Sequence, residues 1–342
     1  MASIVGRGLT RAALILCVFA SVACKKEESQ PAQYPPGQYP QQPYPQQGAY
    51  PQQQPPQQQP GQVAQPQPGV AAPVANPATD PINQLDILFL RAEANTLLAE
   101  LVAALPPAHQ GRVTGNPLVV DSTPGEVNAF AACTQQGRAG MAITDGLLEI
   151  SAQLARAKAI DELAGTRKVD EYIQFLAQNQ QPKQPIVRPQ AGFFDPRFDG
   201  DPRKLERQRQ LLDEELAFIL GHELAHHYLN HLPCTSGVAG VAEIGHLLSG
   251  AVPMLNQPNE LMADSYGTNN VLTAGSRRQG YRFTEGGGLL TMRFFSGLDQ
   301  FSPADIFSFE RSHPPPQLRS PLITQTANTW RAYGGRPPLL VF

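Results

Sequence analysis

Hydrophobic residues recur every three or four positions along several stretches of the chain, which is the spacing of amphipathic helices. The first stretch covers residues 85–105 and stops at a pair of prolines, which cannot continue a helix. A second helix is expected to begin at Thr144 or Asp145, either of which can cap it, and a further helical stretch reaches Phe175. The longest stretch contains no helix breaker over residues 202–231. Later helices are expected over residues 238–248, 256–272, 286–298 and 316–333.

Three short extended runs lie between the first two helices, at residues 118–121, 127–131 and 140–144. Asn, Pro and Gly bound them, which is typical of strands in a small antiparallel sheet. Residues 182–202 are rich in proline and glycine, so we expect an irregular loop there. The pattern predicts an α+β fold that is mostly helical, with a small antiparallel sheet.

The first 23 residues have the anatomy of an export signal, with arginines before an apolar run that is too short to span a bilayer. Small residues precede Cys24, as in the lipobox of bacterial lipoproteins, and two lysines follow it, which resembles an outer-membrane sorting context. We therefore expect a lipid anchor on Cys24 and a lipoprotein of the bacterial outer membrane that faces the periplasm. The alternative is an ordinary cleaved signal with an incidental cysteine.

Residues 24–80 are expected to form a disordered tether. Within residues 31–80, proline and glutamine account for 14 and 15 of the 50 positions, which leaves too little aliphatic surface for a packed core. A docking segment for a proline-binding partner is the other interpretation. Residues 81–342 are long enough for one domain with a sizeable core. The net charge of -3 gives no reason to expect nucleic acid as a partner.

The candidate chemistry lies in His222-Glu223-Leu224-Ala225-His226, inside the longest predicted helix. Histidines four residues apart project from one face of a helix and can hold one metal ion. Glu223 is placed to act on a water molecule rather than to bind the metal. A catalytic zinc usually has three protein ligands and one open position, so a third ligand is expected.

The position of the third ligand separates two classes of zinc protease. In metzincins it would be a histidine six residues after His226, but that residue is Leu232. His231 would point about 140° away from His226 on a continuous helix, so we interpret it as structural. A gluzincin takes a glutamate from a following helix, and Glu260 fits that pattern. Asp264 shares its helix face and could orient a ligand histidine. Taken alone, this acidic pair is also compatible with a solvated helix face.

Several segments together resemble the M48 family of metallopeptidases. Residues 127–131 and 141–148 resemble a strand beside the cleft and the strand and turn that follow it. Residues 214–221 lead into the metal helix as in the family, and residues 260–267 match its third-ligand helix. Residues 312–319 resemble its C-terminal Ser/Thr-His-Pro motif with a following arginine. The chain departs from the family in its long stretch over residues 152–202 and at Cys133.

The resemblance implies a zinc-dependent endopeptidase that hydrolyses peptide bonds in unfolded or extended polypeptides, with one Zn²⁺ per chain. It implies His222, His226 and Glu260 as ligands, Glu223 as the catalytic base and Asp264 as the residue that orients a ligand. His313 and Arg319 are candidates for stabilising the oxyanion or closing the site, and His313 is also a candidate for the open metal position at rest. The substrate is expected to bind as an added strand along Asn128, Ala129 and Phe130.

Two other functions fit the same sequence. One is a periplasmic chaperone or assembly factor with latent or secondary protease activity, whereas for the endopeptidase the resemblance implies a role in envelope protein quality control. The other is a structural lipoprotein whose zinc is only a brace. Cys133 and Cys234 are the cysteines left in the folded region, and in an oxidising compartment they could form a disulfide or stay as buried thiols. The sequence does not assign an oligomeric state.

Overall fold

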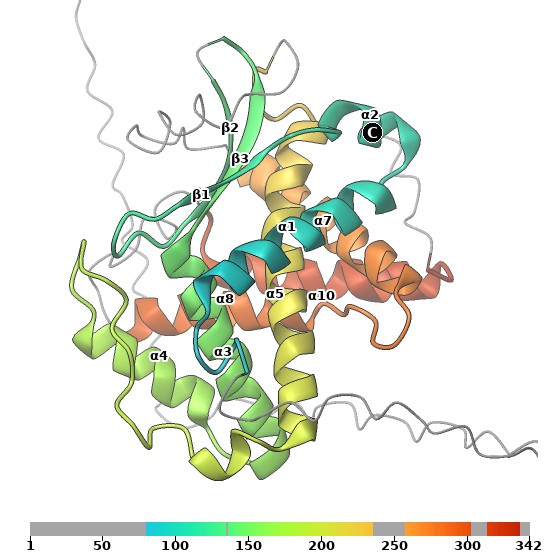
Figure 1. Ribbon diagram of the computed structural model, residues 1–342. Helices are drawn as coiled ribbons and strands as arrows, with labels where there is room; N and C mark the ends of the chain where they lie inside the picture. The colour runs from blue at the N-terminus through green and yellow to red at the C-terminus, as the bar shows by residue number, and fades with distance from the viewer. Residues whose placement is uncertain (1–79, 135, 235–256, 302–312, 336–342) are drawn as a thin grey trace, which may run out of the picture. The chain divides into compact units, whose positions relative to one another are not determined.

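The computed structural model describes residues 80–134, 136–234, 257–301 and 313–335 (Figure 1). The expected signal segment, the tether and the helix expected over residues 238–248 lie outside these ranges. The described residues form a mostly helical structure with one small sheet, as predicted. The helices are α1 (Ile87–Ala104), α2 (Pro107–Val113), α3 (Asp145–Ala164), α4 (Lys168–Asn179), α5 (Pro202–Tyr228), α7 (Gln257–Arg277), α8 (Gly286–Phe301) and α10 (Pro316–Ala332). The strands are β1 (Leu118–Asp121), β2 (Ala129–Cys133) and β3 (Ala139–Thr144). Among these residues, no helix is long and apolar enough to cross a membrane.

Helix α5 is the element around which the others pack. Figure 1 shows it in yellow running through the middle of the helices, and it contacts α1, α3, α7 and α8 along its length. Every residue from Leu211 to Tyr228 is buried, so its second half is covered on all sides. A helix covered in this way can hold polar side chains only where they find partners or bind an ion. The His-Glu-x-x-His motif lies in this buried half.

The sheet is mixed, which corrects the prediction of an antiparallel sheet. Strand β3 lies in the middle, paired in parallel with β1 and antiparallel with β2. The three extended runs were expected to form an antiparallel sheet, but β1 lies on the far side of β3 from β2 and runs parallel to β3. Within the described structure, strand β2 therefore pairs only with β3, and it also packs against α5.

Thr144 fixes the junction of the sheet with α3. Its side-chain oxygen accepts a hydrogen bond from the N–H of Leu147 in the first turn of α3, at 3.2 Å. The same oxygen accepts from the N–H of Asn128 at 3.0 Å, and the N–H of Thr144 donates to the carbonyl of Asn128. Of the two candidate caps, Thr144 is the one the structure uses, and it also ties the start of β2 to the end of β3.

Two glycines allow α5 and α7 to cross at very short range. A Cβ atom on Gly267 of α7 would lie 2.9 Å from the backbone nitrogen of His222 and 3.0 Å from the carbonyl carbon of Gly221. A side chain on Gly221 would in turn contact Val271 and Gly267. Only residues without Cβ atoms permit this approach, which brings the acidic face of α7 next to the histidines of α5.

The Gly267→Ala variant is therefore expected to lower the free energy of unfolding by about 1–3 kcal/mol, because the added methyl group meets backbone atoms that cannot rotate away. The matched control is Gly111→Ala in α2, where an added Cβ meets nothing within 4 Å. That variant is expected to gain up to about 1 kcal/mol from helix propensity. Urea unfolding of both variants checks the difference in sign, and equal effects would contradict the close crossing.

Candidate metal centre

Three of the predicted ligands converge on one point between α5 and α7. The Nε2 atoms of His222 and His226 are 3.1 Å apart. Glu260 places Oε2 at 3.4 Å from Nε2 of His222 and Oε1 at 3.5 Å from Nε2 of His226. All three side chains are at most 2% exposed. Oε2 of Glu260 is buried and has no hydrogen-bond partner within the described residues. Two imidazoles and one carboxylate with such an unpaired oxygen fit a divalent metal ion.

Asp264 and Arg319 support the centre from the outer side of His222. Nδ1 of His222 donates to Oδ1 of Asp264 at 2.9 Å, which leaves Nε2 free to face the metal position. Arg319 donates to both carboxylate oxygens of Asp264, from Nε at 2.8 Å and from Nη2 at 2.7 Å. Both residues are almost fully buried. Burial opposes ionisation of Asp264, but the guanidinium of Arg319 outweighs it and holds the pKa of Asp264 well below its usual range.

Arg319 therefore differs from its expected role beside the reacting carbonyl. Its guanidinium lies behind His222, where Nη2 is also 3.3 Å from Nδ1 of that histidine. A bidentate pair with a buried carboxylate is a rigid support. This geometry favours a role in orienting Asp264 over a role in stabilising an oxyanion.

The pKa values of the two ligand histidines are shifted in opposite directions. Burial disfavours a charge on His222, but the neighbouring carboxylates of Asp264 and Glu260 outweigh it and raise its pKa to about 9. Burial and the neighbouring His222 lower the pKa of His226 well below its usual value. Binding of a metal ion through Nε2 of either histidine requires that this nitrogen carries no proton.

Glu223 joins the metal position to the sheet. Its Oε2 accepts a hydrogen bond from the N–H of Ala131 in β2 at 2.8 Å. Its Oε1 is buried without a hydrogen-bond partner in the described residues and lies 3.7 Å from Nε2 of His313. The same nitrogen of His313 is 3.6 Å from Oε2 of Glu260. His313, from the segment before α10, therefore faces the centre directly, and Glu223 has one oxygen fixed and one aimed at it.

Only part of the expected substrate strand is available for main-chain pairing. Both backbone groups of Asn128 bond to Thr144. Along an edge strand of an antiparallel pair, every second residue directs its N–H and C=O toward the neighbouring strand. Phe130 is two residues after Asn128, so its backbone groups also point at β3, opposite Ala142. The N–H and C=O groups of Ala129 and Ala131 point away from β3, toward the edge that pairs with no other described strand. There the N–H of Ala131 already donates to Glu223. The prediction is thus wrong for main-chain bonds at Asn128 and Phe130, while Ala129 faces the edge.

A disulfide joins Cys133 to Cys234, with Cα atoms 5.2 Å apart. It connects the end of β2 to the chain that follows α5. His227 adds a second tie, because its Nε2 donates to the carbonyl of Gly140 in β3 at 2.9 Å. The end of the metal helix is therefore fastened to both strands of the antiparallel pair.

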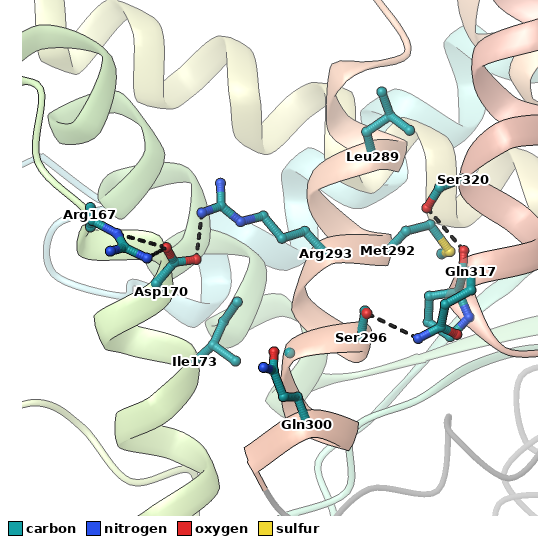
Figure 2. A pocket seen from close by; sticks show the side chains of 12 residues that line it. Arg167, Asp170, Ile173, Leu289, Met292, Arg293, Ser296, Gln300, Gln317 and Ser320 are labelled. Atoms are coloured by element: carbon teal, nitrogen blue, oxygen red, sulfur yellow. Dashed lines mark hydrogen bonds and ion pairs between the residues drawn. The ribbon is translucent and has the colours of Figure 1, made fainter. Parts of the chain in front are cut away.

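Two hollows lie on the α8 and α10 side of the molecule. One, of about 90 Å³, is lined by His313, Arg319 and the prolines between them, and so adjoins the centre. The other, of about 500 Å³, lies between α4, α8 and α10, and Figure 2 shows Asp170 paired there with Arg167 and Arg293. Met292 and Pro316 border both hollows. The candidate metal ligands among the described residues lie beside the smaller hollow, whose lining includes His313.

His231 is the residue at the centre whose contact the sequence did not predict. The helix was expected to run through it, but α5 ends at Tyr228, and Nδ1 of His231 comes within 3.0 Å of Nδ1 of His226. The signal that could have indicated an earlier end is Asn230, a residue that tolerates the left-handed conformation at which helices often stop.

Replacing Arg319 by methionine is expected to destabilise the protein by about 3–5 kcal/mol, because it leaves the carboxylate of Asp264 buried without its charge partner. Affinity for a divalent metal should also fall by about 10–100-fold, as for other residues that orient a ligand. The control is Arg293→Met, which removes a half-exposed partner of Asp170 and should cost at most about 1 kcal/mol. Thermal unfolding and zinc titration test both, and unchanged zinc affinity in Arg319→Met would exclude the supporting role.

The chain matches peptidase family M48 over residues 95–326, a span that includes all the residues of the centre. No curated protein and no solved structure matches the chain significantly. The match covers well over half of the sequence and agrees with the convergence of His222, His226 and Glu260. On this evidence the chain belongs to peptidase family M48, a family of metal-dependent proteases.

Proposed function

We propose that the protein is a zinc-dependent endopeptidase that cleaves unfolded or extended polypeptides. The observation that carries the proposal is the position of Glu223, which has one oxygen fixed by Ala131 and the other aimed at a buried set of two imidazoles and one carboxylate. Two histidines and one glutamate are the ligands of a well-known class of catalytic zinc sites. The arrangement is therefore suited to hydrolysis next to an edge strand.

Each residue has a definite task in this proposal. A bound zinc ion supplies Lewis-acid chemistry, polarising the scissile carbonyl and making a water molecule more acidic. Oε1 of Glu223 takes the proton from the attacking water and later delivers it to the leaving amine. His313 Nε2 faces the same space and is placed to donate a hydrogen bond to the developing oxyanion. Its closeness to Glu260 also suits a resting state in which His313 takes the open metal position.

The edge of β2 that pairs with no other described strand suits an extended substrate. Ala129 offers an outward N–H and C=O, and Ala131 offers its C=O, so a peptide can add as a strand through these groups. Binding through the backbone requires a substrate segment that is not already folded. It also depends little on the substrate's side chains, which favours broad over narrow sequence preference.

Zinc content and casein cleavage of the purified protein test the proposal, with Glu223→Gln as the comparison. Both forms are expected to bind about one zinc per chain, whereas removal of the base should lower the cleavage rate by at least about 100-fold. Zinc binding without cleavage in either form would reject the peptidase and favour a chaperone or assembly factor with a latent site. In cells, the Glu223→Gln strain should accumulate misfolded envelope proteins if the enzyme serves quality control there.

We also propose that the protein is an outer-membrane lipoprotein of the bacterial envelope that faces the periplasm, with its lipid on Cys24. The small residues before that cysteine support lipidation at Cys24, and the lysines after it support an outer-membrane location. Cys24→Ser is expected to remove fatty-acid labelling and to move the protein from the membrane fraction to the soluble fraction. A variant that still sediments with the outer membrane after this change would contradict a lipid anchor at this residue.

A further inference from the structure

The chain turns back sharply after α5 and returns toward the metal centre. Asn230 has a φ of 58°, in the left-handed region. The N–H of His231 donates to the carbonyl of His226 at 2.9 Å, and the N–H of Asn230 donates to that of His227 at 3.1 Å. These two bonds define a Schellman motif, in which the second residue past the helix contacts the residue at the start of the last turn. In this chain those residues are His231 and His226.

The side chains of these two histidines meet at their Nδ1 atoms. The two nitrogens are 3.0 Å apart, and the rings are nearly perpendicular, with an angle of 66° between their planes. A hydrogen bond between two ring nitrogens requires that one carries a proton and the other does not. Nε2 of His226 faces His222 and Glu260, so it is the nitrogen that would bind the metal. Its proton therefore belongs on Nδ1, which donates to Nδ1 of His231.

We propose that His231 is a positioning residue that fixes the ring orientation and the tautomer of the ligand His226. It does so through an imidazole nitrogen, whereas Asp264 does the same for His222 through a carboxylate oxygen. Partners of this kind commonly change metal affinity when they are removed. The inference rests on the metal site of the proposed function, but it concerns how the protein holds the metal and does not depend on cleavage.

The turn that carries His231 is held at both ends. At one end, the two Schellman hydrogen bonds fasten it to the last turn of α5. At the other end, Cys234, which lies three residues after His231, forms a disulfide with Cys133 of β2. The ring of His231 is thus fixed against His226 by covalent and hydrogen-bonded contacts on either side of it, which is what a positioning residue needs.

The test compares His231→Asn with His231→Gln in the full-length chain. The amide oxygen of asparagine can take the place of the Nδ1 acceptor, whereas the longer glutamine places its amide near the position of Nε2. We measure the zinc dissociation constant by competition with a chelator, the visible spectrum of the Co²⁺-loaded protein, and thermal unfolding of the metal-free protein. His231→Gln is expected to bind zinc about 10–100-fold more weakly with an altered Co²⁺ spectrum, and His231→Asn within about threefold of the unmodified chain.

The metal-free variants should unfold within a few degrees of each other, so that a loss of zinc affinity reports on the site and not on folding. Equal zinc affinity of His231→Gln and the unmodified chain would overturn the inference, and so would equal losses in both variants. An unmodified chain that binds zinc but does not cleave casein would instead reject the proposed function and leave the role of His231 standing.

Discussion

The close crossing of α5 and α7 at Gly221 and Gly267 is the constraint on which the metal centre depends. Glu260 lies two helical turns before Gly267, so its carboxylate reaches His222 and His226 only if the helix axes stay at this distance. The three ligand side chains are at most 2% exposed at this crossing. The ligands consequently lie in a buried site, where an unpaired carboxylate oxygen is costly unless a cation balances it.

The two ligand histidines are held by partners of different charge. His222 donates to the ionised Asp264, which Arg319 keeps in place, whereas His226 contacts the imidazole of His231. A carboxylate partner makes an imidazole a stronger donor to a metal than a neutral acceptor does. Of the two histidines, His222 is thus expected to be the stronger donor to the metal. His226 depends on a turn outside the helix, so the chain after α5 is part of the metal site as well as a connection.

The sequence predicted the helices that carry the centre, because helical periodicity and proline positions are local signals. It also indicated Glu260 and Asp264, but only through the gluzincin pattern that follows the His-Glu-x-x-His motif, because an acidic pair on one helix face is by itself equally compatible with a solvated surface. The pairing of β1 was mispredicted because strand order depends on contacts between distant residues, which short extended runs do not encode. Asn128 and Phe130 were assigned to the substrate edge without a register, and a shift of one residue reverses which backbone groups face outward. Arg319 and His231 acquire their contacts only after the chain has folded back on α5.

The bond between Glu223 and the N–H of Ala131 links the proposed catalytic base to the strand along which a substrate would lie. That N–H is at the free edge of β2, so a substrate strand cannot use it while the carboxylate holds it. A peptide paired with Ala129 would therefore continue past Glu223 instead of displacing it. Under the proposed function, such a peptide can still pair with the C=O of Ala131, and its chain would then pass beside the second oxygen of Glu223. One hydrogen bond thus orients the carboxylate of Glu223 and also occupies one donor at the edge of β2.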